Sequence, residues 1–367
     1  MPSLTVGLLK RGNHSRATQH PTNKQRLSGK VRFVNKKIGI TAVALASAVT
    51  ILTSVIFAQR QKVAAPATSS IGSYLPASDA VAVIDVKRTL TQTMPSILGS
   101  DPAKLAQANA EVDKFKTRTG IDLRSFDQMV LSVRYTYPSA TSTKLETVAI
   151  AHGKFDPKSV VASARQAAAG KARDEQYHGA TITIINVNDE LKMFGIWSMK
   201  VDDLAVCALD QNSLALGSPE TVRAAIDAGR KGLAPADLIA LATRDPNAVM
   251  GFGANMTPEL LAKLDVGNDT LAKDIGSIKQ AYGSIGSTQS DVTLMVVART
   301  DSPQSATNLS DTVEGLRQLG GLFIGRMAQP RRALAESALT NLKITTRGSE
   351  IEIRTQVAAA NLAALIK

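Results

Sequence analysis

The stretch ETVAIAHGKFDPKSVVASARQ, residues 146–166, shows how the folded part of this chain is built. Its first eight residues alternate or carry β-branched side chains, which is typical of a strand. Asp156 then provides a side-chain acceptor directly before Pro157, a pair that favours an N-cap followed by the first turn of a helix. Beyond the proline, Val160 and Ala164 fall on one helical face. The stretch therefore predicts a strand, a turn and an amphipathic helix in succession.

The pairing of a capping residue with proline recurs elsewhere and predicts four further helix starts. These pairs are Asp101-Pro102, Ser218-Pro219, Thr257-Pro258 and Ser302-Pro303. Gly120 is expected to end the first of these helices, and Gly320-Gly321 the last. Because the helices carry apolar stripes, we expect them to pack on a sheet.

Strand patterns occur between these helices and predict that sheet. They cover residues 80–86, 129–137, 146–153, 180–187, 204–210, 247–255, 291–300, 341–348 and 350–357. In the last of them Ile351 and Ile353 alternate with Glu350 and Glu352, and Gly348-Ser349 before it indicates a hairpin. Strand pairs interleaved with helices predict an α+β fold with a mainly antiparallel sheet and amphipathic helices packed on it.

The order of these elements also repeats along the chain. DVTLMVVARTDSPQSATNLSDTVEGLRQ, residues 291–318, has the same strand, turn, cap-proline and helix as residues 146–166. We interpret residues 76–233 and 234–367 as two divergent copies of one α+β unit. Two such copies would share a continuous sheet or enclose a cleft.

Positive charge is concentrated at the N-terminus. The chain has 43 Lys and Arg against 31 Asp and Glu, a net charge of +12. Residues 1–37 hold nine of the basic residues and no acidic one, so 34 basic residues face 31 acidic ones in the remainder, which carries +3. We interpret residues 1–37 as a disordered basic tail. A near-neutral remainder, and a tail whose one aromatic residue is Phe33, argue against nucleic-acid binding.

Residues 38–58, from Ile38 to Ala58, form an uncharged run of 21 residues between basic flanks. As a helix it would span about 32 Å, close to the thickness of a bilayer core. The sequence predicts a transmembrane helix with the N-terminus in the cytoplasm, the bulk of the chain outside, and anionic lipid headgroups beside the tail. The alternative is a cleaved signal peptide, but the basic region and the apolar run are long for one. Residues 59–75 are interpreted as a linker.

Three stretches resemble a group of uncharacterised bacterial envelope proteins with one N-terminal transmembrane segment and a duplicated α+β ectodomain. They are Leu75-Pro76-Ala77-Ser78-Asp79-Ala80, Phe115 with Thr119-Gly120-Ile121-Asp122-Leu123, and Leu216-Gly217-Ser218-Pro219-Glu220. The resemblance covers residues 75–367 and implies a bacterial inner-membrane protein with a periplasmic domain. It implies no catalytic residue.

Candidate catalytic groups are few. The part of the chain after the apolar run has two histidines, His152 and His178, each before a glycine, and lacks the spacings typical of metal sites. A hydrolase with a site between the copies would use His152, His178 or Asp156. We expect the two histidines to be structural, since glycine-flanked turns commonly hold such residues.

Other chemistry-bearing residues have structural explanations. The single cysteine, Cys207, lies in an apolar run and is expected to be buried. Ser218 is expected to be an N-cap, and Gly283-Ser284-Ile285-Gly286-Ser287 a tight turn. The pairs Asp189-Glu190 and Asp202-Asp203 are expected in polar loops, and Phe194 and Trp197 in the core.

These observations predict a membrane-anchored extracytoplasmic binding or structural module with no cofactor or metal and no assigned catalytic residue. The alternatives are an envelope hydrolase with a site between the copies, and a carrier of an apolar ligand. The sequence does not identify the ligand or protein partner.

Overall fold

The computed structural model describes residues 71–139, 142–193, 197–232, 234–262, 269–288, 290–329 and 331–363. These residues belong to one compact unit. The expected transmembrane run from Ile38 to Ala58, the basic tail and most of the expected linker lie outside them. In the part of the chain that is described, no helix has both the length and the apolar composition needed to cross a membrane.

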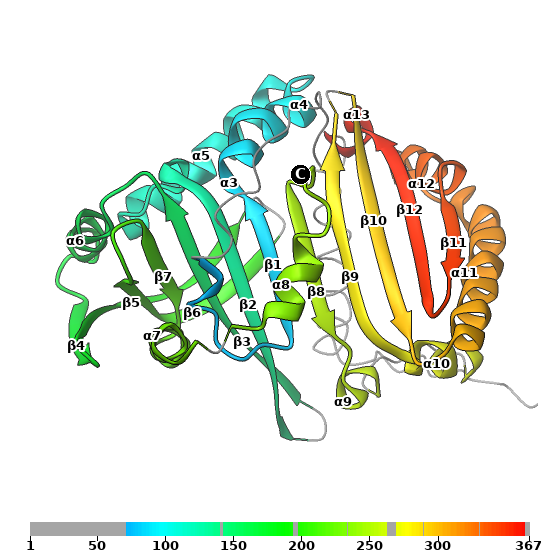
Figure 1. The fold of residues 1–367 in the computed structure, drawn as a ribbon. Helices are drawn as coiled ribbons and strands as arrows, with labels where there is room; N and C mark the ends of the chain where they lie inside the picture. The colour runs from blue at the N-terminus through cyan, green and yellow to red at the C-terminus, as the bar shows by residue number, and fades with distance from the viewer. Residues whose placement is uncertain are drawn as a thin grey trace, which may run out of the picture. The chain divides into compact units, whose positions relative to one another are not determined.

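Twelve antiparallel strands form one sheet (Figure 1). Their order across the sheet is β11-β12-β10-β9-β8-β1-β2-β3-β7-β6-β5-β4. The strands are β1 (Ala80–Asp85), β2 (Phe126–Ser139), β3 (Ser142–Gly153), β4 (Ala172–Tyr177), β5 (Ala180–Met193), β6 (Trp197–Ala208), β7 (Ser213–Gly217), β8 (Met250–Asn255), β9 (Ile278–Ser287), β10 (Asp291–Thr300), β11 (Lys343–Arg347) and β12 (Glu350–Ala358). The α+β class and the antiparallel sheet with helices are confirmed.

All five predicted helix starts are confirmed. The caps Asp101, Asp156, Ser218, Thr257 and Ser302 each accept a hydrogen bond from a backbone N–H in the first turn. The helices are α3 (Val86–Arg88), α4 (Met94–Leu98), α5 (Pro102–Thr119), α6 (Pro157–Ala167), α7 (Pro219–Lys231), α8 (Ala236–Ala242), α9 (Pro258–Leu261), α10 (Asp269–Gly276), α11 (Pro303–Ile324), α12 (Arg331–Thr340) and α13 (Ala359–Ala363), with a π-helical turn at Thr89–Thr93 and a 3₁₀ turn at Leu123–Ser125.

The helix ends agree less well. Gly120 ends α5 with φ 71°, a conformation that glycine adopts without strain. The expected end of α11 at Gly320-Gly321 is wrong, because this helix continues to Ile324.

All nine expected strands exist, and the sequence missed β4, β7 and β9. The tight turn expected over Gly283-Ser284-Ile285-Gly286-Ser287 is wrong, because these residues belong to β9. A Cβ on Gly283 would lie 2.2 Å from the carbonyl oxygen of Met295, so glycine serves close packing there.

One row of mutually opposite residues crosses all twelve strands. Residues directly opposite each other in an antiparallel pair point to the same side of the sheet. The row runs Glu175, Ile182, Cys207, Ala215, Ile150, Val130, Val83, Gly251, Ser284, Met295, Arg354, Lys343. From Ile182 to Val83 every side chain is apolar and buried, whereas beyond Gly251 the row ends in Arg354 and Lys343.

Helices explain this change of polarity. Over β1–β7 this side of the sheet is packed by α7 and α8 in a cluster that includes Val222, Ile226 and Leu238. The helix α8 lies directly on β8, since a Cβ on Gly253 would approach the Leu238 carbonyl oxygen to 2.8 Å. The cluster also contains Ile71 and Leu75, so the expected linker does not reach to residue 75 and the packed part of the chain includes residues 71–75.

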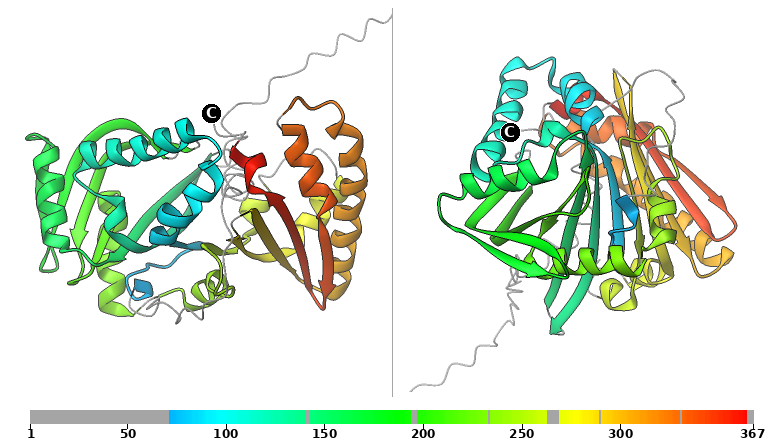
Figure 2. Two further views of the ribbon diagram at one scale, coloured as in Figure 1. Left: turned by 90° about the horizontal axis from the view of Figure 1, so that it is seen from above. Right: turned by 60° about the vertical axis from the view of Figure 1, so that its left-hand side comes forward.

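The other side of the sheet is covered along its length. In β10 and β12, Ala298 and Ile351 pack against Leu309 of α11, and the view from above in Figure 2 shows α11 and α12 on this side. Towards β1, a larger cluster joins α3–α6 to the ends of β9, β10 and β12 through Ile285, Val292 and Val357. The strands β1–β7 and the strands β8–β12 therefore meet here over packed apolar side chains.

Candidate functional site

The histidines and Asp156 occupy separate places in the fold. His152 on β3 is half-buried, with Nδ1 3.2 Å from the Ser213 hydroxyl on β7. His178 forms a two-residue turn with Gly179 between β4 and β5, where both have positive φ, and its Nε2 lies 3.5 Å from Asp227. Neither residue lies on β1 or β8, the two strands through which residues 76–233 pair with residues 234–367, and no interaction among the described residues joins the two histidines to each other or to Asp156.

Asp156, Ser218 and Cys207 have local roles. Asp156 caps α6. The hydrogen bond from the Ser159 hydroxyl, followed by those from the backbone N–H groups of Lys158 and Ser159, lowers the pKa of Asp156. Ser218 caps α7 as expected. Cys207 is fully buried, and burial raises the pKa of its thiol to about 11.

The acidic pairs lie in strands rather than in the expected polar loops. Asp189-Glu190 belongs to β5 and Asp202-Asp203 to β6. Asp203 accepts hydrogen bonds from Arg173 at 2.8 Å and from Asn186 at 3.1 Å, which explains its lowered pKa. Phe194 and the side chain of Trp197 lie outside the described residues.

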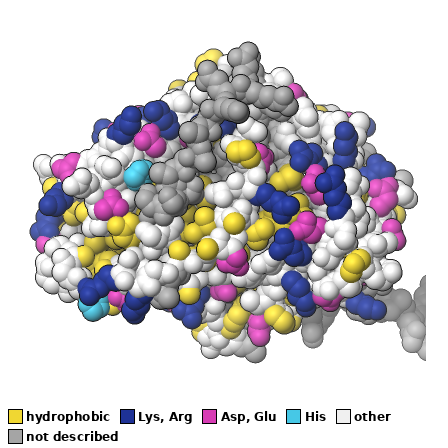
Figure 3. Space-filling view, in the orientation of Figure 1, with side chains coloured by type: hydrophobic (Ala, Val, Ile, Leu, Met, Phe, Trp, Pro, Cys, Tyr) yellow, Lys and Arg dark blue, Asp and Glu magenta, His cyan; other side chains and the backbone are white. Residues whose placement is uncertain are grey.

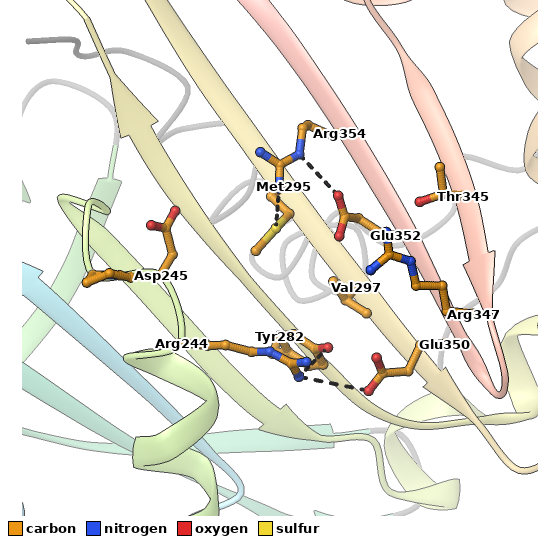
Figure 4. A pocket seen from close by; sticks show the side chains of 11 residues that line it. Arg244, Asp245, Tyr282, Met295, Val297, Thr345, Arg347, Glu350, Glu352 and Arg354 are labelled. Atoms are coloured by element: carbon orange, nitrogen blue, oxygen red, sulfur yellow. Dashed lines mark hydrogen bonds and ion pairs between the residues drawn. The ribbon is translucent and has the colours of Figure 1, made fainter. Parts of the chain in front are cut away.

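A polar pocket of about 350 Å³ lies on the side of β9, β10, β12 and β11 where α8 packs at one margin, through Leu241 against Tyr282, Met295 and Val297, and where no described helix covers β12 and β11. We call this side the open face. One row of opposite residues across it consists of Tyr282, Val297, Glu352 and Thr345. In Figure 3, basic and acidic side chains gather over these strands. Figure 4 shows the pocket floor of Tyr282, Met295 and Val297, with the chain that follows α8 as one wall and β11 and β12 as the other.

Tyr282 is the centre of one group of side chains. The Arg244 guanidinium lies 4.9 Å from the ring centroid and donates to the Tyr282 hydroxyl at 2.7 Å. The Arg299 guanidinium lies 5.8 Å from the same centroid. Burial, followed by the charge of Glu350, raises the pKa of Tyr282, so the phenol stays protonated at neutral pH. Both cations are attracted to this buried aromatic ring.

Glu350 is the shared ion-pair partner of both of these arginines. Arg299 donates to the carboxylate at 3.0 Å through Nε and 2.8 Å through Nη2, and Arg244 lies 4.0 Å away. Burial alone would raise the pKa of Glu350, but hydrogen bonds from Arg299 and Tyr282 and the two positive charges outweigh it, so the pKa is lowered. The carboxylate is therefore ionised, and this part of the site is fixed rather than available to a ligand.

A second ion pair lies further along β12. Arg354 donates to Glu352 at 3.1 Å and to the Met295 sulfur at 3.1 Å. Across the pocket, Asp245 accepts from the Ser284 hydroxyl at 2.9 Å and from the Asn247 backbone N–H at 3.0 Å. The pocket therefore presents charged groups of both signs around a buried floor.

One sequence pattern predicted part of this site. The alternation of Glu350, Glu352 and Arg354 with apolar residues predicts a strand with one solvent-facing side, which is confirmed. The contributions of Arg244, Asp245 and Tyr282 were missed. They come from a loop and from β9, and only the strand register brings them to β12.

No protein-family model and no curated protein sequence matches the chain. Solved structures similar to it include crystal forms III, I and IV of TP0453, with TM-scores of 0.42, 0.39 and 0.42. They are 10–11% identical in sequence, and the matches cover 81% of this chain and 96–97% of TP0453. A likeness this low carries no argument about function.

Proposed function

We propose that the chain is a membrane-anchored, extracytoplasmic module of the bacterial envelope that binds a small charged ligand in the pocket on its open face. The single observation that carries the binding role is the change along the row across the sheet. From Ile182 to Val83 the row is apolar and covered by helices, but at Arg354 and Lys343 it is charged and no described helix covers it.

The anchor part of the proposal is supported by the sequence. The run from Ile38 to Ala58 has the length of a bilayer span, and the nine basic residues before it favour a cytoplasmic N-terminus. The same basic residues would lie beside anionic lipid headgroups.

Two divergent copies, residues 76–233 and 234–367, are also part of the proposal. The order β1, β2, β3, α6 is matched by β8, β9, β10, α11, and the hairpin β6–β7 with α7 by the hairpin β11–β12 with α13. The copies would meet at the β1–β8 pair, and the hairpin β4–β5 would be an addition to the first.

This correspondence offers a reason for the open face. After β7 the chain forms α7, which packs on the same side as Val83. After β12 it forms α13, whose Ala359 and Leu362 pack on the opposite side with α4. The second copy would therefore lack the helix that covers this side of the first.

Binding can be tested on the full chain in detergent micelles with ¹³C-methyl methionine. Met295 on the pocket floor is the reporter, and Met129, which packs on the opposite side of the sheet, is the internal control. The probes are inorganic phosphate, glutamate, lysine and dialanine, with glucose as the uncharged comparison. We expect at least one charged probe to shift the Met295 resonance without shifting that of Met129. If none does, binding at the open face is refuted.

The anchor can be tested by deleting residues 38–58. The full chain is expected in the membrane fraction after alkaline carbonate extraction, and the deleted chain in the soluble fraction. A full chain that is released by carbonate would contradict the anchor.

A further inference from the structure

The charges that line the pocket are not all matched within the protein. Glu350 is engaged by Arg244 and Arg299, and Glu352 by Arg354. Two charged groups remain. Among the described residues, Asp245 has no cationic partner and Arg347 forms no ion pair.

These two groups lie on opposite walls. Asp245 follows α8, whereas Arg347 is at the end of β11, and Figure 4 shows the pocket floor between them. Asp245 is half-buried, and its position is fixed by the Ser284 hydroxyl from β9. Arg347 is exposed, and its place opposite Glu350 is set by the two-residue turn at Gly348-Ser349.

The floor between the two groups is buried and largely apolar. Met295 is 9% exposed, Val297 3% and Tyr282 2%. The Arg244 guanidinium lies over the Tyr282 ring and the Arg354 guanidinium contacts the Met295 sulfur, so the carbon skeleton of a ligand would lie between these two side chains, with its charged ends at the walls. At about 350 Å³ the pocket is at the lower end of the range for small-molecule sites.

We propose that the ligand is a small zwitterion of the amino-acid or short-peptide class, with its ammonium group at Asp245 and its carboxylate at Arg347. Only a ligand with one charge of each sign leaves neither group unpaired, and charge-assisted hydrogen bonds are the stronger class. This assignment rests on the proposed binding function and specifies its ligand.

The experiment compares four peptides at the Met295 resonance of the full chain: dialanine, N-acetyl-dialanine, dialanine amide and the doubly blocked peptide. We expect dialanine to bind most tightly and each single block to weaken binding about tenfold, as for the loss of one charged hydrogen bond. A doubly blocked peptide that binds as tightly as dialanine would overturn the assignment.

Two variants test the contacts of the two charged ends of the ligand separately. With Asp245→Asn, dialanine and its N-acetyl form should bind equally, while the carboxylate preference remains. With Arg347→Gln, dialanine and dialanine amide should bind equally, while the preference for a free ammonium group remains. Arg134→Gln, which changes an exposed arginine on β2, is the matched control and should preserve both. An unchanged ammonium preference in Asp245→Asn would contradict the assignment, provided that the Met129 resonance shows a native fold.

The outcomes also distinguish this inference from the function on which it rests. If phosphate moves the Met295 resonance and neither dialanine nor the amino-acid probes do, the binding module stands and the zwitterion assignment fails. If no charged probe moves it, both fail.

Discussion

The carbonyl oxygen of Ala242 lies 1.8 Å from the position that a Cβ on Gly251 would occupy. The helix α8 therefore rests on the bare backbone of β8, and this contact places residues 244–246 at the pocket wall. Any side chain at residue 251 must push α8 away, because backbone rather than a flexible side chain occupies the space.

Gly251→Ala is accordingly expected to lower the free energy of unfolding by about 1–3 kcal/mol, as other overpacking substitutions do. Gly286→Ala on β9 is the matched control, since a Cβ there meets nothing within 4 Å, and should change stability by less than about 0.5 kcal/mol. Urea unfolding of the full chain followed by circular dichroism measures both. Equal losses of stability in the two variants would contradict the close packing of α8 on Gly251.

Cys207 should be inert in the native protein. It is fully buried and its thiol pKa is raised to about 11, so little thiolate is present at pH 8 and reagents cannot reach it. We expect a thiol reagent to modify it only after unfolding. A Cys207→Ala chain carrying Ala162→Cys on the exposed side of α6 should react at once. Rapid native labelling of Cys207 would contradict the burial.

Asp156 should act as a helix cap. Asp156→Ala is expected to lower the stability, because two backbone N–H groups of α6 lose their acceptor. Asp156→Ser should recover most of this loss, since serine is also a good N-cap. If a function of the protein were abolished equally by both substitutions, a chemical role for the carboxylate would be indicated instead.

Glu350 should make stability depend on pH in the acidic range. Its pKa is lowered in the folded state, so its contribution is complete above the unfolded pKa of about 4.3 and is lost as pH falls through the folded pKa. Between pH 5 and 3 the wild-type chain should therefore lose more stability than Glu350→Gln.

Arg299→Gln is the companion variant, because it removes the main hydrogen bonds that lower the Glu350 pKa. It should also flatten the pH dependence. The slope should not vanish in either variant, since Asp122, Asp174 and Asp203 also have lowered pKa values. Urea midpoints at several pH values give the slopes, and an unchanged slope in both variants would contradict the role of this pair.

The sequence predicted local structure better than it predicted the site. The five N-caps and the hairpin at Gly348-Ser349 depend on neighbouring residues, and all were confirmed. The strand β9 was missed because Gly283 and Gly286 suggested a turn. Close packing against Met295, which lies on another strand, is what requires glycine at residue 283.

The pocket could not be predicted for the same reason. Asp245 and Arg347 are far apart in the sequence. Their positions across the pocket from each other depend on the order of β9, β10, β12 and β11 in the sheet. An exposed arginine and an aspartate after a short helix are ordinary surface residues in isolation. Only the register across four strands places them on facing walls.

The pairing of β1 with β8 has a consequence for synthesis of the chain. Ala80 pairs with Ala254, so β1 is made long before the strand that completes its hydrogen bonding. Until then Val81 and Val83 belong to an edge strand whose apolar side is not yet covered by α8. A nascent chain, or one truncated after α7, exposes this edge and is expected to self-associate. Successful folding therefore requires β8 to pair with β1 before another molecule binds to the exposed edge.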